Sequence, residues 1–165
     1  MKLKKSALIY DISNIAYVIA DTGDDSSHIL HKVRDICEEG NLDRVSRILG
    51  LAYARLLTIL SPVLNSPGMN LNHDFTAVPH DYEFNFRKGG NLKYLLTTEH
   101  KLHIKELCRE FMVCFVLADW LSITLPQAAD SWKFRTDFIL KSLSDIITSI
   151  TANSQAIFRR RLSPF

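Results

Sequence analysis

The sequence predicts a mainly α-helical protein, an antiparallel bundle of about five helices with a β-hairpin at about residues 82–97 inserted between helices three and four. Two observations lead to this prediction. Most of the chain repeats its apolar residues every three or four positions, which is the spacing of one helical face. One stretch, Tyr82–Leu96, instead alternates apolar and polar residues around Gly89-Gly90, which is typical of two strands joined by a tight turn.

Three helices are expected before the hairpin, over about residues 6–21, 26–39 and 41–60, because each range keeps its apolar residues on one face. Gly40 stands where the end of a helix favours glycine, and Pro62 follows the end of the third range. The connections are short, so these helices are expected to pack as antiparallel neighbours.

Two further helices are expected after the hairpin, over about residues 98–122 and from Thr124 to about residue 151. The second of them begins with Thr124-Leu125-Pro126-Gln127, which has the pattern of a capping box with proline in the first turn. Residues 154–165 lack a helical period and contain three arginines and no acid. We therefore expect residues 1–153 to form the bundle with its inserted hairpin, and residues 154–165 to form a short basic tail.

The second arm of the hairpin has a competing interpretation, in which the next helix begins at Asn91. The hairpin is favoured because a tight turn between strands needs positive φ at both central residues, which Gly-Gly supplies. A lone two-stranded ribbon is only marginally stable in water, so it must pack against the bundle or against a neighbouring molecule. The side that makes this contact would carry Tyr82, Phe84 and Phe86, together with Tyr94 and Leu96.

Composition excludes several classes of protein. The chain is 47% hydrophobic and 23% charged, as in ordinary globular domains, and its net charge of +2 is too small to indicate a nucleic-acid partner by itself. Three cysteines without C-x-x-C spacing argue against a disulfide framework or a zinc ribbon. No apolar run reaches the roughly 18 residues of a membrane span, and Asp11, Ser13 and Asn14 interrupt the one that imitates a secretory signal. We expect a cytoplasmic protein with no membrane contact and no cofactor.

Histidine pairs are the first place to look for a metal site. His100 and His103 are three residues apart, as are His28 and His31, and this spacing can chelate one ion on a helix. The second pair points away from the apolar stripe of its helix, and the chain lacks the Glu-x-x-His pairs of a di-metal bundle. His100 and His103 are the candidates that remain, although we favour the interpretation without a metal.

Asp119 is the acid in the most unusual place. A helical wheel puts it on the buried side of its helix, where an unpaired carboxylate is costly. Arg135 lies about as far after the following turn as Asp119 lies before it, so an antiparallel helix pair would bring the two level. We therefore predict a structural ion pair between Asp119 and Arg135, with a catalytic role for Asp119 as the alternative.

Asp11 supports a third and less favoured hypothesis, a metal-dependent hydrolase or nuclease. The stretch ALIYDISN could be an apolar strand that ends in a carboxylate, which is how many such enzymes present their first metal ligand. These folds need further strands with acids at their ends, whereas the segments that follow predict helices. Asp11 also fits the flank of a helix, so an enzyme is not the favoured class.

The favoured function is a non-enzymatic assembly or adaptor module that associates with itself or with another protein. Tyr10 and Tyr17 lie on the outer side of the first helix, and Phe134 and Phe138 lie off the main stripe of the fifth. Apolar groups on a second helical face need another helix or a partner subunit to cover them. Together with the hairpin, these aromatic residues form the predicted interaction surface.

The alternative function is nucleic-acid binding, through two groups of basic residues. Arg44, Arg47 and Arg55 share one flank of the third helix, and Arg159, Arg160 and Arg161 lie in the tail beside aromatic residues. Basic side chains interleaved with aromatic ones suit a nucleic-acid backbone. Asp43, one turn before Arg47, can however pair with it, and charges on a helix flank are usually only solvated.

Overall fold

The computed structural model describes residues 1–21, 28–65, 81–87 and 96–162, and it confirms the mainly α-helical fold. The elements, in chain order, are β1 (Lys2–Lys4), α1 (Lys5–Asp21), α2 (His28–Arg34), η1 (Asp35–Cys37), η2 (Glu39–Asn41), α3 (Leu42–Leu60), β2 (Asp81–Glu83), α5 (Thr98–Thr124) and α6 (Pro126–Leu162). The two η elements are short 3₁₀ turns that lead from α2 into α3.

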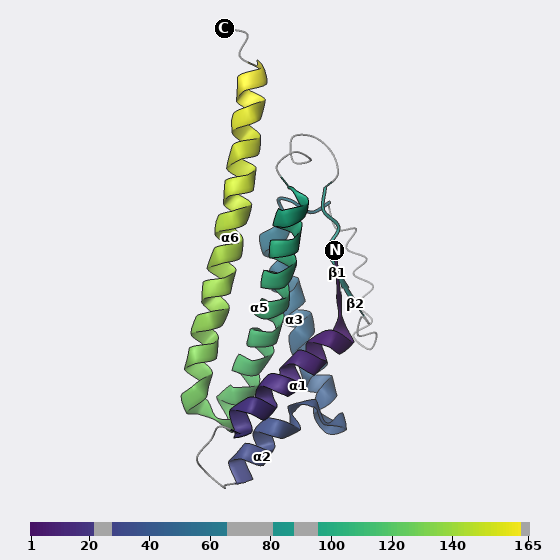
Figure 1. Cartoon of the computed structure of the whole chain (residues 1–165), viewed down its shortest axis with the longest axis vertical. Helices are drawn as coiled ribbons and strands as arrows, with labels where there is room; N and C mark the ends of the chain where they lie inside the picture. Colours follow the sequence, from purple (N-terminus) through teal and green to yellow (C-terminus); the bar gives the residue numbers. More distant parts are fainter. Residues whose placement is uncertain (22–27, 66–80, 88–95, 163–165) are drawn as a thin grey trace.

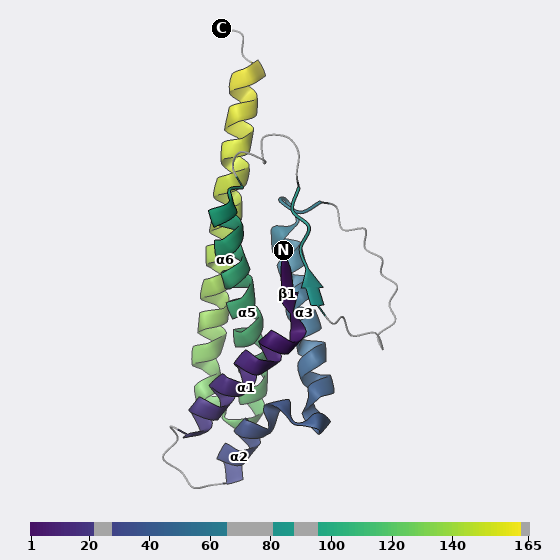
Figure 2. The same cartoon turned by 45° about the vertical axis from the view of Figure 1, so that its right-hand side comes forward.

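Helix α5 is the centre of the bundle, with α6 along one side and α1 and α3 on the other (Figure 1). A tight turn at Leu125, whose backbone N–H donates to the carbonyl of Leu121 at 2.8 Å, sends α6 back antiparallel to α5. Turning the molecule shows that the last turns of α6 extend beyond the ends of the other helices (Figure 2). Within the described part of the chain, no helix combines the length and the apolar character needed to cross a membrane.

The sequence of α5 explains its central position, because apolar residues surround most of its circumference. All four residues from Phe111 to Cys114 are buried, although consecutive positions point to different sides of a helix. The outer helices instead bury one stripe each. In α1 this stripe recurs every fourth residue, at Leu8, Ile12, Ala16 and Ala20.

The β-structure lies where the sequence predicted it, between α3 and α5, but its strand partner comes from the start of the chain. Strand β2 pairs antiparallel with β1, with Leu3 opposite Tyr82. The amide of Phe84 donates to the carbonyl of Met1 at 2.7 Å, and the Met1 ammonium returns a bond to the Phe84 carbonyl at 2.8 Å. Most of the predicted second arm falls within residues 88–95, which lie outside the described residues. Its described end is not a strand, because Leu96 is a buried residue in a bend and Thr97 caps α5.

The aromatic side of this ribbon faces the core. Tyr82 and Phe84 are fully buried, and Phe86 is 8% exposed. Tyr53 of α3 packs against the rings of Tyr82 and Phe84, with centroid distances of 5.1 and 5.2 Å. The ribbon thus packs against the helices of its own chain. Its three aromatic residues are therefore not available as an interaction surface in the folded chain, and Tyr94 lies outside the described residues.

Helix α6 continues well beyond its predicted end near residue 151, up to Leu162, so the boundary expected at residue 153 falls inside a continuous helix. The physical reason is local, because the stretch TANSQAIFRRRL contains neither proline nor glycine, and the next proline is Pro164. The side chains of α6 are described as far as Asn153. Among these, one set is buried against the bundle. They are Ala129, Thr136, Ile139, Leu140, Leu143, Ile147 and Ile150.

Candidate functional site

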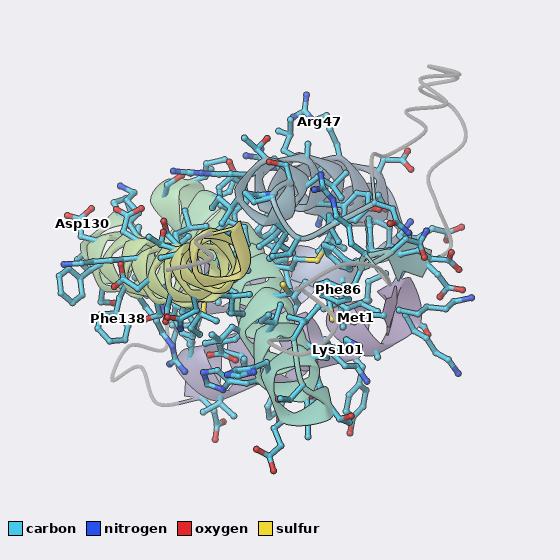
Figure 3. The ribbon with its side chains drawn as sticks, turned by 90° about the horizontal axis from the view of Figure 1, so that it is seen from above. Met1, Arg47, Phe86, Lys101, Asp130 and Phe138 are labelled. Atoms are coloured by element: carbon cyan, nitrogen blue, oxygen red, sulfur yellow. The ribbon has the colours of Figure 1, made fainter. Side chains whose placement is uncertain are left out.

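Two large aromatic side chains stand on the side of α6 that faces away from the core. Phe134 is 75% exposed and Phe138 is 63% exposed, and they lie one helical turn apart. Seen from above, Phe138 and Asp130 point away from the bundle, whereas Met1 and Phe86 lie on the opposite side of α6 (Figure 3). The buried stripe of α6 holds this outer surface rigid, because Thr136, Ile139 and Leu143 are packed on the reverse side of the same turns.

Charged residues flank the two phenylalanines. Asp130, Lys133, Asp137 and Lys141 are all exposed, and the Lys133 ammonium lies 3.0 Å from the Asp130 carboxylate. We call these four residues together with Phe134 and Phe138 the outer face of α6. An apolar centre with a charged rim is the composition of a protein–protein contact.

The predicted ion pair between Asp119 and Arg135 does not form. Asp119 instead accepts two bonds from Arg44 of α3, from Nη2 at 2.7 Å and from Nε at 3.2 Å. Arg135 donates to Glu110 of α5. Asp119 pairs with α3 rather than α6, and Arg135 meets Glu110, which lies nine residues before Asp119 on α5. With its charge matched by Arg44, Asp119 does not have the environment of an unpaired catalytic acid.

The Arg44–Asp119 pair borders an open groove of about 400 Å³ between α3, α5 and α6. Its residues are Ile48, Leu51, Arg55, Phe115, Ala118, Asp119, Ser122, Lys133, Thr136 and Asp137. Its two hydroxyl groups donate to backbone carbonyls, Ser122 to Asp119 and Thr136 to Trp132, so neither is placed as a nucleophile beside a side-chain base.

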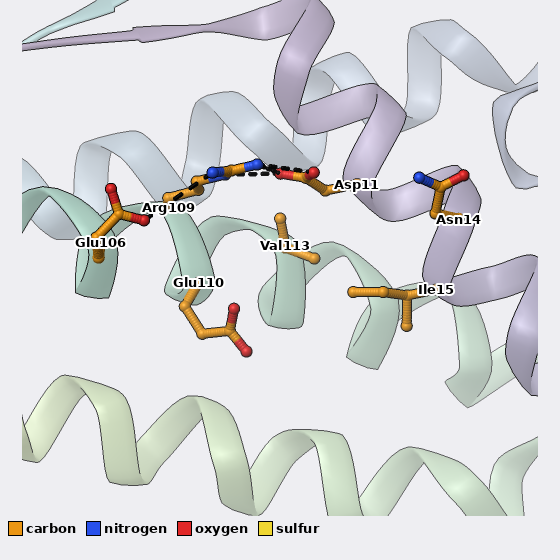
Figure 4. Close-up of a pocket in the computed structure, with 7 residues that line it drawn as sticks. All are labelled: Asp11, Asn14, Ile15, Glu106, Arg109, Glu110 and Val113. Carbon is orange, nitrogen blue, oxygen red and sulfur yellow. Dashed lines mark hydrogen bonds and ion pairs between the residues drawn. The ribbon is translucent and has the colours of Figure 1, made fainter.

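Asp11 lies inside α1 and not at the end of a strand, so the premise of the hydrolase hypothesis is wrong. Its carboxylate is held by Arg109 of α5, with Nε–Oδ2 and Nη2–Oδ1 distances of 2.7 and 2.8 Å (Figure 4). Sequence reasoning missed this pair and also the Glu110–Arg135 pair. The signal was present, because Glu106, Arg109 and Glu110 are charged residues on one side of α5 that directly precede its most apolar turns.

These charges border a second open pocket, of about 270 Å³, between α1 and α5. Asp11, Asn14, Ile15, Glu106, Arg109, Glu110 and Val113 line it. The Asp11 and Glu110 carboxylates each face an arginine, and Glu106 lies 3.9 Å from Arg109. A ligand would have to compete with these internal pairs for every charge in the pocket.

The histidine and cysteine residues do not form a metal centre in the part of the chain that the structure describes. His100 and His103 are exposed, and the backbone amide of His100 donates to Oγ1 of Thr97, which caps α5. Within the described residues, no group of three or more His, Cys, Asp or Glu side chains is placed to hold an ion. Burial raises the pKa of Cys108 and of Cys114 to about 12, which keeps both thiols protonated at neutral pH.

The basic flank of α3 is only partly free. Arg44 is committed to Asp119, whereas Arg47 and Arg55 are exposed and form no ion pair among the described residues. Arg47 points outward from α3 (Figure 3). Arg159, Arg160 and Arg161 belong to the last turns of α6, and their side chains lie outside the described part.

The aromatic pair on α1 is less open than the pair on α6. Tyr10 is 67% exposed and Tyr17 is 56% exposed. The Arg34 guanidinium lies over the Tyr17 ring, 4.9 Å from its centroid, and pairs with Asp21 at 3.3 Å. Tyr17 therefore already has a partner within its own chain.

Comparison with protein-family models, with curated proteins and with solved structures finds no significant match to this chain. Of the predicted interaction residues, the structure leaves Tyr10, Tyr17, Phe134 and Phe138 at the surface and buries the three described aromatic residues of the ribbon.

Proposed function

We propose that this protein is a non-enzymatic assembly module that associates with itself through the outer face of α6. The observation that carries this proposal is the exposure of Phe134 and Phe138 side by side on a well-packed helix. Covering a phenylalanine side chain fully is worth about 1.5–3 kcal/mol relative to leaving it in water. Two of them at the centre of a charged rim supply the anchor that a contact between subunits needs.

Rigidity of the surface supports the proposal further. The reverse side of these turns is buried against α5 and α3, so the outer face is ordered before any partner arrives and association costs little additional order. The last turns of α6 extend past the other helices (Figures 1 and 2). A helix gains most of its stability from packing of one face, so a partner along α6 would stabilise these turns.

The mass in solution, measured by light scattering after size-exclusion chromatography, tests the proposal. Phe134→Ser with Phe138→Ser should reduce the mass to that of the monomer while the helical circular-dichroism signal stays unchanged. The matched control is Tyr10→Ser with Tyr17→Ser, which removes two exposed aromatic side chains, slightly less open than the phenylalanines, from α1. A monomeric wild type would overturn the proposal, and a loss of mass in the control alone would assign the contact to α1.

Nucleic-acid binding is the second candidate, favoured by one observation. Arg47 and Arg55 are exposed on the same helix, two turns apart, and have no carboxylate partner among the described residues. Binding of random-sequence DNA or RNA should then weaken steeply with salt. Replacing both arginines by glutamine should reduce the slope of log K against log salt by about one for each residue. Binding that is undetectable at low salt would exclude this candidate.

A further inference from the structure

The charged residues of the outer face of α6 alternate in sign along the helix. Asp130, Lys133, Asp137 and Lys141 follow one another at intervals of three or four residues, so they lie on one flank. In chain order their charges are negative, positive, negative and positive. All four side chains are exposed, and Lys133 shares its charge only with Asp130 among the ion pairs of the described residues.

An alternating set of four charges is complementary to its own reversed copy. When a second α6 runs in the opposite direction, it presents positive, negative, positive and negative charges to this flank. When it runs in the same direction about a two-fold axis, this flank instead meets the other flank of the second helix, and the four charges gain no matching partners. We propose, on the basis of the self-association proposed above, that two copies pair antiparallel through α6, with Asp130 opposite Lys141 of the second copy and Lys133 opposite Asp137.

The aromatic residues agree with this arrangement. Residues 130 and 141, 133 and 137, and 134 and 138 have nearly the same midpoint, close to Arg135 and Thr136. One two-fold axis there brings Phe134 and Phe138 of both copies together, so the four rings cover one another. This is an isologous contact, in which each residue meets its counterpart symmetrically.

The residue nearest the axis on the other flank does not oppose the pairing. Arg135 would approach Arg135 of the second copy, but its guanidinium is already held by Glu110 and lies over the Trp132 ring, 5.6 Å from its centroid. The pair formed with Glu110 neutralises the positive charge at this point. The phenylalanines thus supply most of the affinity, and the alternating flank selects the direction of the second helix.

A four-fold charge reversal tests the direction of pairing. The variant Asp130→Lys, Lys133→Asp, Asp137→Lys, Lys141→Asp keeps an alternating flank, so it should associate with itself as the wild type does. In an antiparallel pair with the wild type, like charges meet at every position, and the mixed dimer should be at least about tenfold weaker than either homodimer. Native mass spectrometry of the variant mixed with isotopically labelled wild type measures the fraction of dimers that contain one copy of each. In a parallel pair this flank would not face its own copy, and the mixed dimer would form as readily as either homodimer.

Two half-reversals test whether the flank acts at all. Asp130→Lys with Asp137→Lys makes it wholly positive, and Lys133→Asp with Lys141→Asp makes it wholly negative. Each should be monomeric at concentrations where the wild type is dimeric, and mixing the two should restore the dimer. If the wild type associates through its phenylalanines but mixes freely with the four-fold variant, the antiparallel inference is wrong and the self-association stands. A monomeric wild type would overturn both.

Discussion

Arg109 of α5 donates two parallel hydrogen bonds to the carboxylate of Asp11 of α1, Nε–Oδ2 at 2.7 Å and Nη2–Oδ1 at 2.8 Å. The two residues are 98 positions apart in the sequence. The planar guanidinium matches both carboxylate oxygens, and this geometry is stronger and more specific than a single contact. The Asp11 side chain is 21% exposed and that of Arg109 is 43% exposed, so water screens the pair in part. It fixes how α1 crosses the central helix.

A double-mutant cycle should detect this pair. Asp11→Asn and Arg109→Met should each destabilise the fold, and the two should couple by about 1–2 kcal/mol, less than a fully buried pair because of the partial exposure. Urea unfolding followed by circular dichroism measures the three variants. The exposed pair of Lys133 and Asp130 serves as the control, with an expected coupling below about 0.5 kcal/mol. Equal couplings in the two cycles would contradict the special role of the Arg109–Asp11 pair.

The partner of Asp119 can be identified in the same way. Asp119→Asn should couple with Arg44→Met, because the carboxylate accepts both of its side-chain bonds from Arg44. It should be additive with Arg135→Met, because that guanidinium is held by Glu110. A coupling of Asp119 with Arg135 but not with Arg44 would mean that α6 is rotated relative to this structure.

Two tyrosines that touch each other should respond in opposite ways to loss of the hydroxyl. The buried hydroxyl of Tyr82 has no hydrogen-bond partner among the described residues, and burial raises its pKa to about 12. Tyr82→Phe should therefore leave the free energy of unfolding unchanged or increase it slightly. The Tyr53 hydroxyl donates to the Glu83 carbonyl at 2.6 Å, so Tyr53→Phe should cost about 0.5–1.5 kcal/mol. Thermal or urea unfolding of both variants decides the matter, and a clear loss in Tyr82→Phe would reveal a missed partner.

The end of α6 should be dispensable for folding. Deleting residues 154–165 removes turns that extend past the bundle and leaves every buried residue of α6 between Ala129 and Ile150 in place. The melting temperature should hardly change. A longer deletion from residue 146 serves as the control, because it also removes the buried Ile147 and Ile150 and should lower the melting temperature clearly. A large loss in the shorter deletion would mean that these last turns contact the bundle.

Stability should fall as the pH rises above about 9, and Cys108 should contribute to this fall. Burial raises the pKa of its thiol from 9.0 to about 12. Between these values the unfolded chain releases the proton and the folded chain keeps it, so the folded state is favoured below the interval and loses stability through it, by up to about 1.4 kcal/mol per pH unit. The difference between wild type and Cys108→Ala, measured by urea unfolding from pH 8 to 10.5, isolates this contribution from that of the tyrosines. A difference that does not vary with pH would contradict it.

The sequence by itself determined where most of the helices lie, because a helix depends on residues three and four positions apart. Helix α3 ends at the predicted Leu60, α5 begins at the predicted Thr98, and α1 begins one residue before the predicted Ser6. The extension of α6 to Leu162 was not predicted, but the sequence contains the information for it, since no proline or glycine interrupts the helix. The β-ribbon was located from the alternation of Tyr82, Phe84 and Phe86, a pattern of equally short range.

Only the tertiary structure decided which surfaces and charges meet. Each residue along a helix turns its side chain by about 100°, so a small error in helix rotation exchanges one neighbouring helix for another. For this reason Asp119 meets Arg44 instead of Arg135. The partner of β2 lies near residue 3, a separation at which periodicity carries no information. The same long-range packing buries Tyr82 and Phe84 of the β-ribbon and leaves Phe134 and Phe138 of α6 exposed to water. The sequence pattern had assigned all four aromatic residues to the interaction surface.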